Sequence, residues 1–242
     1  MKMTAQEILN ELVDKDRIQD QEGRIGFSLG DVSLVVKQKD VVGNILQEWF
    51  GEWLRKKGAV FATSQNTQMP PDFFLDPSDR TRDMLEIKAF NAAATPAFDI
   101  ADFKMYEQEL MEKPYVLDVD YLIFGYRMSP AGIVTISDVW LKKVWQIARR
   151  MKNWPLNLQV KRHIVQKIRP CVWFNPPRGF HPFRNEWDFV SAIEETIGRN
   201  VDTRADYQTW RPRFLENYSK FYPDRPRPRI PRWPEIEDSY VV

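Results

Sequence analysis

The sequence predicts an α/β (α+β) fold, in which helices flank a mixed β-sheet core. Short apolar or alternating runs bounded by Pro, Gly and Asp fill the middle of the chain and are typical of strands. Stretches with apolar residues three to four positions apart surround them, as amphipathic helices require. With 242 residues, of which 43% are hydrophobic, the chain can fill one substantial core. We therefore expect a single domain over residues 1–242.

The first elements are predicted to be a helix, a hairpin and a second helix. Thr4 and Glu7 have the spacing of a capping box and precede a short apolar stripe. Residues 23–36 alternate around a Gly-Asp turn, which indicates a hairpin. Apolar residues within 42–54 recur at helical spacing, so a well-buried helix should follow.

The middle of the chain should supply the sheet, and the last third should contain little regular structure. Strands are predicted at residues 59–63, 72–75, 83–90, 121–128 and 132–137. Helical spacing is present at residues 99–113 and 139–151. Frequent prolines after residue 170 argue against long elements, except around 187–197. The tail at 223–238 is expected to be extended.

Charge is distributed unevenly along the chain. Residues 1–139 hold 15 Lys and Arg against 23 Asp and Glu, whereas residues 140–234 hold 20 against 8. A basic half that also carries Trp, Tyr and Phe is typical of a surface that contacts phosphates. The alternative is an ordinary solvated face.

Several classes of protein are disfavoured. No apolar run approaches the roughly 18 to 20 residues that span a bilayer. The N-terminal segment lacks the pattern of a signal peptide, and the single cysteine, Cys171, cannot form an internal disulfide. We therefore expect a cytoplasmic protein without membrane contact. Because there is no Walker loop and no GxGxxG motif, a nucleotide cofactor is not expected.

The residues that carry chemistry lie in the segment PPDFFLDPSDRTRDMLEIKAF. Glu86 and Lys88 are two apart in a predicted strand, so their side chains share one face. Asp72 opens the preceding strand. If the two strands pair through the polar turn between them, a second carboxylate joins Glu86 and Lys88.

Such a cluster suits the hydrolysis of phosphodiesters. The carboxylates of Asp72 and Glu86 and the carbonyl of Ile87 offer hard oxygen ligands to Mg²⁺, which can activate water and neutralise the leaving oxygen. Lys88 can orient the attacking water and stabilise the charge that develops in the transition state.

The spacing alone is weak evidence, because an acid two positions before Lys occurs twice in this chain. The second instance, Asp102 and Lys104, lies in a segment of helical pattern, where such side chains point apart. Residues alone leave open an ordinary ion pair on an edge strand.

The segment PDFFLDPSDRTRDMLEIKAF resembles the active-site hairpin of type II restriction endonucleases in the EcoRV-like branch of the PD-(D/E)xK superfamily. The segments KPYVLDVDYLIFGY, VWLKKVWQIA and RGFHPF resemble the NgoBV/NlaIV group of these enzymes. The resemblance extends from the second helix to about residue 197 and implies a restriction-endonuclease-like fold. It also implies Mg²⁺-dependent cleavage of both DNA strands at a short palindrome, GGNNCC in this group, which leaves 5′-phosphates.

The resemblance also assigns roles to residues. It makes Asp72 and Glu86 the metal ligands and Lys88 the catalytic lysine. Many members add a glutamate from the helix before the motif, for which Glu48 is our choice and Glu52 the alternative. An exposed helix carboxylate without a catalytic role is an equally simple interpretation of Glu48.

DNA recognition is expected from loops and from the basic half. A catalytic core at 41–150 would then be followed by a recognition and wrapping region at 151–234. Amide and basic side chains can read base edges, and other basic side chains can contact phosphates. The candidates for base edges are Gln65, Asn66 and Gln68 in one loop and Asn157, Gln159, Lys161 and Arg162 in another; those for phosphates are Arg149, Arg150 and Lys152. The alternative is that the base-edge candidates contact only phosphate or water.

The target also bears on assembly. A two-fold DNA site is most simply read by a two-fold protein, so we expect a homodimer bound to double-stranded DNA. Two alternatives stay open. The same fold can serve a repair or recombination nuclease, and the chain can instead be a DNA-binding module without catalysis.

Overall fold

The computed structural model describes residues 1–39, 41–66 and 69–242. The chain divides into two compact units. The first comprises residues 1–65, 71–98 and 120–142, and the second comprises residues 66–70, 99–119 and 143–242. Among the described residues, no helix has both the length and the apolar character needed to cross a membrane.

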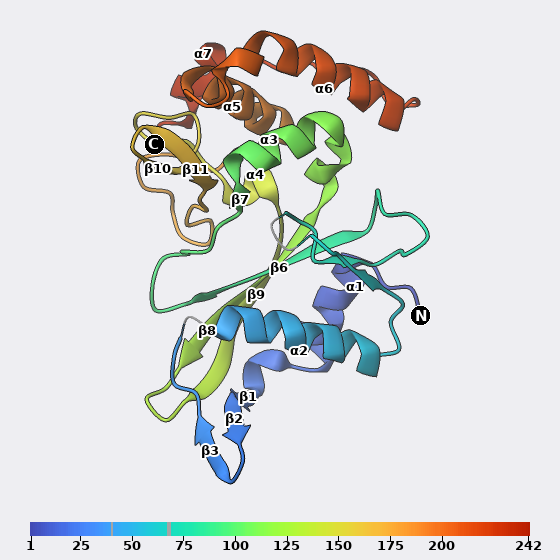
Figure 1. The fold of residues 1–242 in the computed structure, drawn as a ribbon, viewed down its shortest axis with the longest axis vertical. Helices are drawn as coiled ribbons and strands as arrows, with labels where there is room; N and C mark the ends of the chain where they lie inside the picture. Colours follow the sequence, from blue (N-terminus) through green and yellow to red (C-terminus); the bar gives the residue numbers. More distant parts are fainter. Residues whose placement is uncertain (40, 67–68) are drawn as a thin grey trace. The chain divides into compact units, whose positions relative to one another are not determined.

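The first unit is built on a six-stranded mixed sheet (Figure 1). In spatial order its strands are β1 (Glu22–Arg24), β9 (Ile133–Lys143), β8 (Asp120–Met128), β6 (Met84–Asn91), β5 (Phe73–Phe74) and β4 (Ala62–Thr63). The central pair β6 and β8 is parallel, whereas β5 is antiparallel to both of its neighbours. The mixed sheet expected from the sequence is therefore confirmed.

Helices cover this sheet and close its core. They are α1 (Ala5–Asn10), which continues as the π-helical turn η1 (Glu11–Lys15), the short turn η2 (Ile18–Asp20), and α2 (Val42–Lys56). The predicted capping box is present, because the Thr4 hydroxyl accepts from the Glu7 N–H and the Glu7 carboxylate accepts from the Thr4 N–H. Phe50 and Leu54 of α2 pack in one core with Leu85 and Ile87 of β6.

The predicted hairpin forms a separate two-stranded sheet in the first unit. Its strands are β2 (Gly26–Leu29) and β3 (Val32–Val35), which are antiparallel and, among residues 1–39, 41–66 and 69–242, pair only with each other. Gly30 has a φ of 60° at the turn, a conformation that glycine adopts without steric cost.

The predicted helix at 139–151 is wrong. Strand β9 continues to Lys143, and the only helix in this stretch of described residues is α4 (Val144–Ile147). Val139 and Leu141 pack against the core, whereas the ring of Trp140 stacks on Phe90. This alternation is the period of a strand. The apolar residues of this segment fit both periods, and pairing in the sheet decided between them.

The second unit combines a small sheet with helices. The sheet contains β10 (Leu158–Lys161), β11 (Ile164–Ile168) and β7 (Ala101–Asp102) in that order, all antiparallel. The helices and turns are α3 (Phe103–Glu112), η3 (Pro114–Asp118), α4, α5 (Glu186–Arg199), η4 (Arg204–Asp206), α6 (Tyr207–Phe221), α7 (Trp233–Ile236) and η5 (Glu237–Tyr240). The predicted helices near 99–113 and 187–197 are thus present.

Helix α6 corrects the expectation that the prolines of the last third exclude long elements. It has 15 residues and contains Pro212. Pro212 removes the hydrogen bond to the carbonyl of Gln208, which belongs to an exposed residue that water can reach. Trp210, Phe214 and Tyr218 are buried at a spacing of four, so the packing of this stripe outweighs the cost of the proline.

The C-terminal tail is irregular from residue 222 to 232, as expected, but the expectation of an extended chain is wrong from residue 233, where α7 and η5 begin. Arg211 of α6 donates to the carbonyl oxygens of Ile230 and Pro231. Trp233 and Tyr240 are buried. The tail is therefore packed within the second unit.

Candidate active site

The structure brings Asp72, Glu86 and Lys88 together in the first unit. Strands β5 and β6 pair with Phe73 opposite Leu85, and the Asp72 N–H donates to the Leu85 carbonyl at 3.1 Å. This register places the Asp72 carboxylate beside β6, where its Oδ2 accepts from the Ile87 N–H at 2.8 Å. The hairpin expected from the sequence therefore carries the second carboxylate to the EIK strand.

Glu86 and Lys88 project from the same face of β6. The Lys88 Nζ lies 2.7 Å from Glu86 Oε1. Leu85 and Ile87 belong to the apolar core on the other face. The strand register predicted from their spacing is thus present, and Glu86 is almost completely buried, with 5% of its surface exposed.

The surroundings of Asp72 disfavour its charged form. The pKa of Asp72 is raised to about 7, first because burial disfavours its charged form and second because the negative charge of Glu86 is close. The hydrogen bond from the Ile87 N–H and the positive charge of Lys88 act in the opposite direction. A cation bound at this carboxylate would act in the same direction as Lys88 and favour the charged form of Asp72.

A divalent cation fits the donors of this centre. Glu86 Oε2 is buried and has no hydrogen-bond partner among the described residues, so this oxygen can bind a cation. In a strand the N–H and C=O of one residue point to the same edge, and the Ile87 carbonyl therefore points to the edge at which Asp72 lies. No group of three His, Cys, Asp or Glu in the described chain could hold a metal. Two carboxylates and a carbonyl are the available set, and hard oxygens are what Mg²⁺ prefers.

Helix α2 contributes a residue that the sequence analysis missed. The Gln47 Nε2 donates to Asp72 Oδ1 at 2.6 Å. Glu48, chosen from the sequence, is exposed, and Glu52 is exposed and pairs with Arg55. The geometry does not support a catalytic role for Glu48 or Glu52. The sequence contains a pattern that identifies Gln47. It precedes the buried Phe50 and Leu54 by one and two turns and so lies on the buried stripe of the helix.

Asp102 and Lys104, the second case of an acid two positions before a lysine, lie at the start of a helix, as their pattern indicated. Asp102 is the N-cap of α3, and its side chain accepts from the Met105 N–H. Lys104 is exposed on that helix. These two residues therefore serve helix capping and surface charge.

The predicted loop after β4 is in part described. Gln65 and Asn66 are exposed, which suits residues that would reach a groove of DNA. Gln68 lies outside the described residues.

The second predicted recognition segment ends in a tight turn. Lys161, Arg162 and His163 are exposed between β10 and β11. Arg162 and His163 have φ values of 50° and 67°, which is the left-handed pair of a type I′ turn normally formed by Asn and Gly. Side chains in this conformation cost about 1 kcal/mol or more each and are concentrated at functional sites. Gln159 is half-buried in β10.

Other predicted DNA contacts have structural partners within the second unit. The Asn157 Nδ2 donates to the Pro170 carbonyl at 2.9 Å, and Arg149 donates to the Arg178 carbonyl at 2.9 Å. The side chain of Arg150 is 12% exposed and is bound to Glu237. These environments do not support phosphate contacts by Arg150, whereas Lys152 is exposed in a turn.

Comparisons with known proteins place this arrangement in a family. The model of the NgoBV restriction endonuclease family matches residues 2–240. The chain is 56% identical over 241 residues to the type II restriction enzyme NlaIV of Neisseria lactamica, covering 99% of this chain and 98% of that one. It is 54% identical over 162 residues to the type II restriction enzyme NgoBV of Neisseria gonorrhoeae, covering 67% of this chain and 92% of the relative.

A solved structure agrees with these matches. The NlaIV restriction endonuclease superposes with a TM-score of 0.95 at 55% identity, covering 100% of this chain and 98% of the other. The restriction-endonuclease fold, the nuclease class and the DNA substrate expected from the sequence are thereby confirmed. The chain therefore belongs to the NgoBV restriction endonuclease family, whose members are type II site-specific deoxyribonucleases.

Proposed function

We propose that this enzyme hydrolyses both strands of double-stranded DNA at a short palindrome, with Mg²⁺ as its metal, and leaves 5′-phosphates. The proposal is carried by the buried Glu86 Oε2, for which no residue in the described part of the chain is a hydrogen-bond donor, beside Asp72 and Lys88. The target GGNNCC rests on the family resemblance alone. We propose catalysis by the first unit and recognition by the region 151–234, in a homodimer with one centre per strand.

In the proposed mechanism, Asp72, Glu86 and the Ile87 carbonyl would hold the metal. Bound there, Mg²⁺ supplies Lewis-acid chemistry at the scissile phosphate. Asp72 keeps its orientation because Gln47 and the Ile87 N–H each donate to one of its oxygens. This fixed geometry removes the entropy cost of assembling the ligands at each turnover.

Lys88 has two tasks in this proposal. Its ammonium, 2.7 Å from Glu86 Oε1, orients the water that attacks phosphorus in line with the 3′-oxygen. It also balances the negative charge that builds on the phosphate oxygens in the transition state. The water oxygen forms the new bond to phosphorus and gives its proton to solvent. The P–O3′ bond breaks and the 3′-oxygen takes up a proton from solvent, so the phosphate stays on the 5′ end of the released strand.

Recognition is assigned to two loops. The turn with Lys161 and Arg162 would read guanine edges in the major groove, to whose O6 and N7 acceptors these side chains donate. Gln65, Asn66 and Gln68 would approach the minor groove, and Lys152 would contact phosphate.

The experiment is cleavage of phage DNA by the purified enzyme with Mg²⁺. Discrete fragments whose ends map to one palindrome and carry 5′-phosphates are the expected result, and Asp72→Asn or EDTA should abolish them. Smeared or structure-dependent cleavage would instead indicate a repair nuclease. DNA binding that is insensitive to Mg²⁺, without cleavage by any divalent ion, would indicate a binding module.

A further inference from the structure

The β2–β3 hairpin has one apolar face. Phe27 lies opposite Leu34, and Leu29 lies opposite Val32. Directly opposed residues share a face, and so these four side chains form one patch. On the other face, the hydroxyl oxygens of Ser28 and Ser33 are 2.8 Å apart. This alternation of apolar and polar residues is typical of a strand pair that buries its apolar face.

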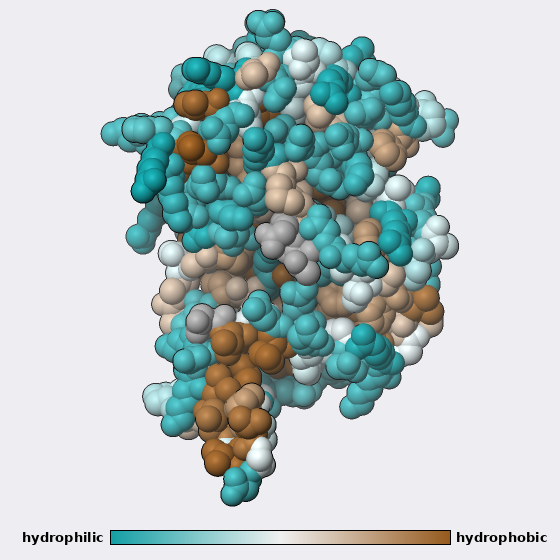
Figure 2. Space-filling view, in the orientation of Figure 1, coloured by the Kyte–Doolittle hydropathy of each residue, from teal (hydrophilic) through white to brown (hydrophobic). Residues whose placement is uncertain are grey.

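This face is exposed to solvent in the monomer. The exposed fractions are 56% for Phe27, 73% for Leu29, 64% for Val32 and 52% for Leu34. Figure 2 shows the brown apolar surface over this hairpin. Isolated two-stranded hairpins are only marginally stable in water, and contiguous exposed apolar patches mark interaction sites.

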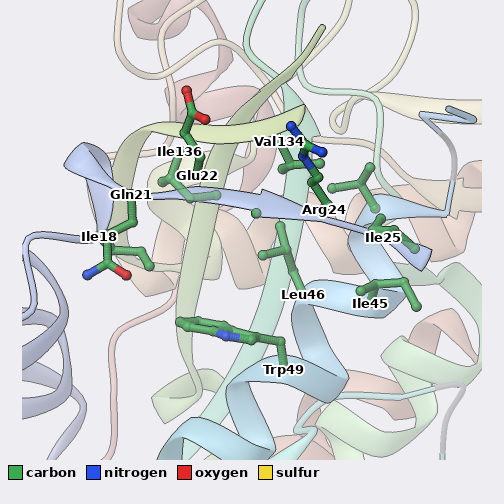
Figure 3. Close-up of a pocket in the computed structure, with 12 residues that line it drawn as sticks. Ile18, Gln21, Glu22, Arg24, Ile25, Ile45, Leu46, Trp49, Val134 and Ile136 are labelled. Atoms are coloured by element: carbon green, nitrogen blue, oxygen red, sulfur yellow. The ribbon is translucent and has the colours of Figure 1, made fainter. Parts of the chain in front are cut away.

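An apolar pocket lies at the base of the same hairpin, within the first unit. Its volume is about 170 Å³. Ile45, Leu46 and Trp49 of α2 point into it toward β1, with Ile25 at one end (Figure 3). A cavity of roughly 150 Å³ is enough for benzene, so the pocket can accept a phenyl or isobutyl group. Ile45 is itself 41% exposed.

The base of the hairpin is fixed in place. At Gly132, in the turn between β8 and β9, an added Cβ would come within 2.5 Å of Val35 Cγ1. The Val36 N–H also donates to the Ile25 carbonyl at 2.8 Å. The exposed patch and the pocket are therefore presented with a defined separation.

We propose that a second copy of this chain covers the patch, with Phe27 or Leu29 of each hairpin inserted into the partner's pocket. A two-fold interface requires the projecting group and its pocket on the same surface. Here Ile25 and Ile45 line the pocket and also a neighbouring hollow that Phe27 and Leu34 line. This inference rests on the homodimer of the proposed function and names the residues of its interface. It does not depend on the proposed chemistry.

The exposed area approaches what a dimer needs. The four patch residues, with Ile45, expose fractions of 41% to 73%. For side chains of roughly 200 Å² each, this amounts to about 600 Å² of apolar surface, against about 800 Å² per partner in a standard interface. The polar rim around the patch would supply the rest.

Charge also favours two hairpins that cross in opposite directions. Asp31 lies at the tip, whereas Arg24 and Lys37 lie near the base. None of these three residues has an ion-pair partner within the described part of the chain. In a two-fold pairing each tip meets the partner's base, so Asp31 would face the partner's Arg24 or Lys37.

The experiment is sedimentation of the chain from about 0.1 to about 50 μM, which covers the weaker end of the affinities that interfaces of this size show. The wild type should be dimeric at micromolar concentration. Phe27→Lys and Leu29→Lys should each weaken dimerisation by about 100-fold or more, as expected for anchor residues. Ser28→Lys, on the opposite face of the same hairpin, is the matched control and should stay dimeric. Circular dichroism should be unchanged in all three variants.

A charge exchange tests the crossing direction. Asp31→Arg should weaken the dimer by roughly 10-fold, and a second substitution, Arg24→Asp, should restore it. A wild type that is monomeric throughout, or a dimer that Phe27→Lys leaves intact, would overturn the proposal. Equal dissociation of Phe27→Lys and Ser28→Lys would do the same.

Lys88→Ala separates this inference from the proposed chemistry. It should remain dimeric while losing cleavage. If the wild type dimerises through the hairpin but cuts no DNA, the catalytic proposal fails and the interface stands. If it cuts DNA as a monomer, the interface fails and the catalytic proposal stands.

Discussion

The side-chain amide of Gln47 donates a hydrogen bond of 2.6 Å to Asp72 Oδ1 and so joins helix α2 to the hairpin that carries Asp72, Glu86 and Lys88. We predict that Gln47→Ala lowers the single-turnover cleavage rate by about 10- to 100-fold, the usual effect of removing a group that orients a metal ligand. The Mg²⁺ concentration for half-maximal rate should rise, since Asp72 is then less well oriented. DNA binding in Ca²⁺, measured by fluorescence anisotropy, should not change.

Two further variants sharpen this prediction. Gln6→Ala removes an exposed helix amide that pairs with Asn10 and should behave as the wild type. Glu48→Gln tests the residue chosen from the sequence. A loss in Glu48→Gln that equals the loss in Gln47→Ala would contradict the assignment of Gln47.

Lys88 and Lys104 form a second matched pair, because each follows an acid by two positions. Lys88 lies 2.7 Å from Glu86, whereas Lys104 is exposed on α3. Lys88→Ala should lower the cleavage rate by about 10²- to 10⁴-fold, the range for a group that transfers protons or stabilises charge in the transition state. Lys104→Ala should cleave normally. Both variants should still bind DNA in a gel-shift assay. Loss of DNA binding in Lys88→Ala would argue against the assigned role.

The sequence was informative about this centre where local geometry decides it. The two-residue period of a strand determines that Glu86 and Lys88 share a face, and a short polar turn brings Asp72 to them. Gln47 was missed for a different reason. Its contact joins residues 25 apart in sequence, and the resemblance pointed to a carboxylate, not an amide, on that helix. Which residue of a helix faces a sheet depends on packing between distant segments.

Two fold errors have a similar origin. Around Trp140, apolar residues fit a helical and a strand period, and the neighbouring strand β8 selected the strand. In α6, Pro212 was interpreted as a break, although the buried stripe of Trp210 and Phe214 compensates for it. In both cases tertiary packing overrode a local preference.

Glu107 gives a prediction about the pH dependence of stability. It is buried in α3, with 3% of its surface exposed, and burial, followed by a smaller effect of Asp206, raises its pKa from 4.5 to about 7. Below pH 4.5 the carboxyl is protonated in both the folded and the unfolded chain, so its burial carries no ionisation penalty. Between pH 4.5 and 7 the unfolded chain loses the proton and the folded chain keeps it, so the free energy of unfolding falls as pH rises.

Glu107→Gln should remove this dependence. The free energy of unfolding of the variant, relative to the wild type, should rise by about 3 kcal/mol between pH 4.5 and pH 7 and then level off. Urea denaturation at unit pH steps measures this difference. Glu112→Gln, at an exposed position of the same helix, should follow the wild type, and a difference that is flat with pH for Glu107→Gln would refute the argument.

Arg211 gives a prediction about the C-terminal tail. Its Nε lies 2.8 Å from both carboxylate oxygens of Glu194. Its Nη1 and Nη2 donate to the Ile230 and Pro231 carbonyls at 3.0 and 3.1 Å. Arg211→Ala leaves a carboxylate and two carbonyls without these donors, so we expect a loss of about 2 kcal/mol in the free energy of unfolding. Arg211→Lys should not restore it, since an ammonium cannot reproduce the planar fork.

Limited trypsin digestion measures how the loss of the Arg211 contacts affects the tail itself. Arg225 and Arg227 precede prolines, which protect their peptide bonds, so cleavage in the tail should occur after Arg229 and Arg232. These bonds flank Ile230 and Pro231, whose carbonyls Arg211 binds, and they should be cut faster in Arg211→Ala because the segment opens more often. Arg213→Ala, an exposed arginine of the same helix, should leave the cutting rate unchanged. Equal rates in Arg211→Ala and the wild type would mean that other contacts, such as the buried Trp233 and Tyr240, suffice to hold the tail.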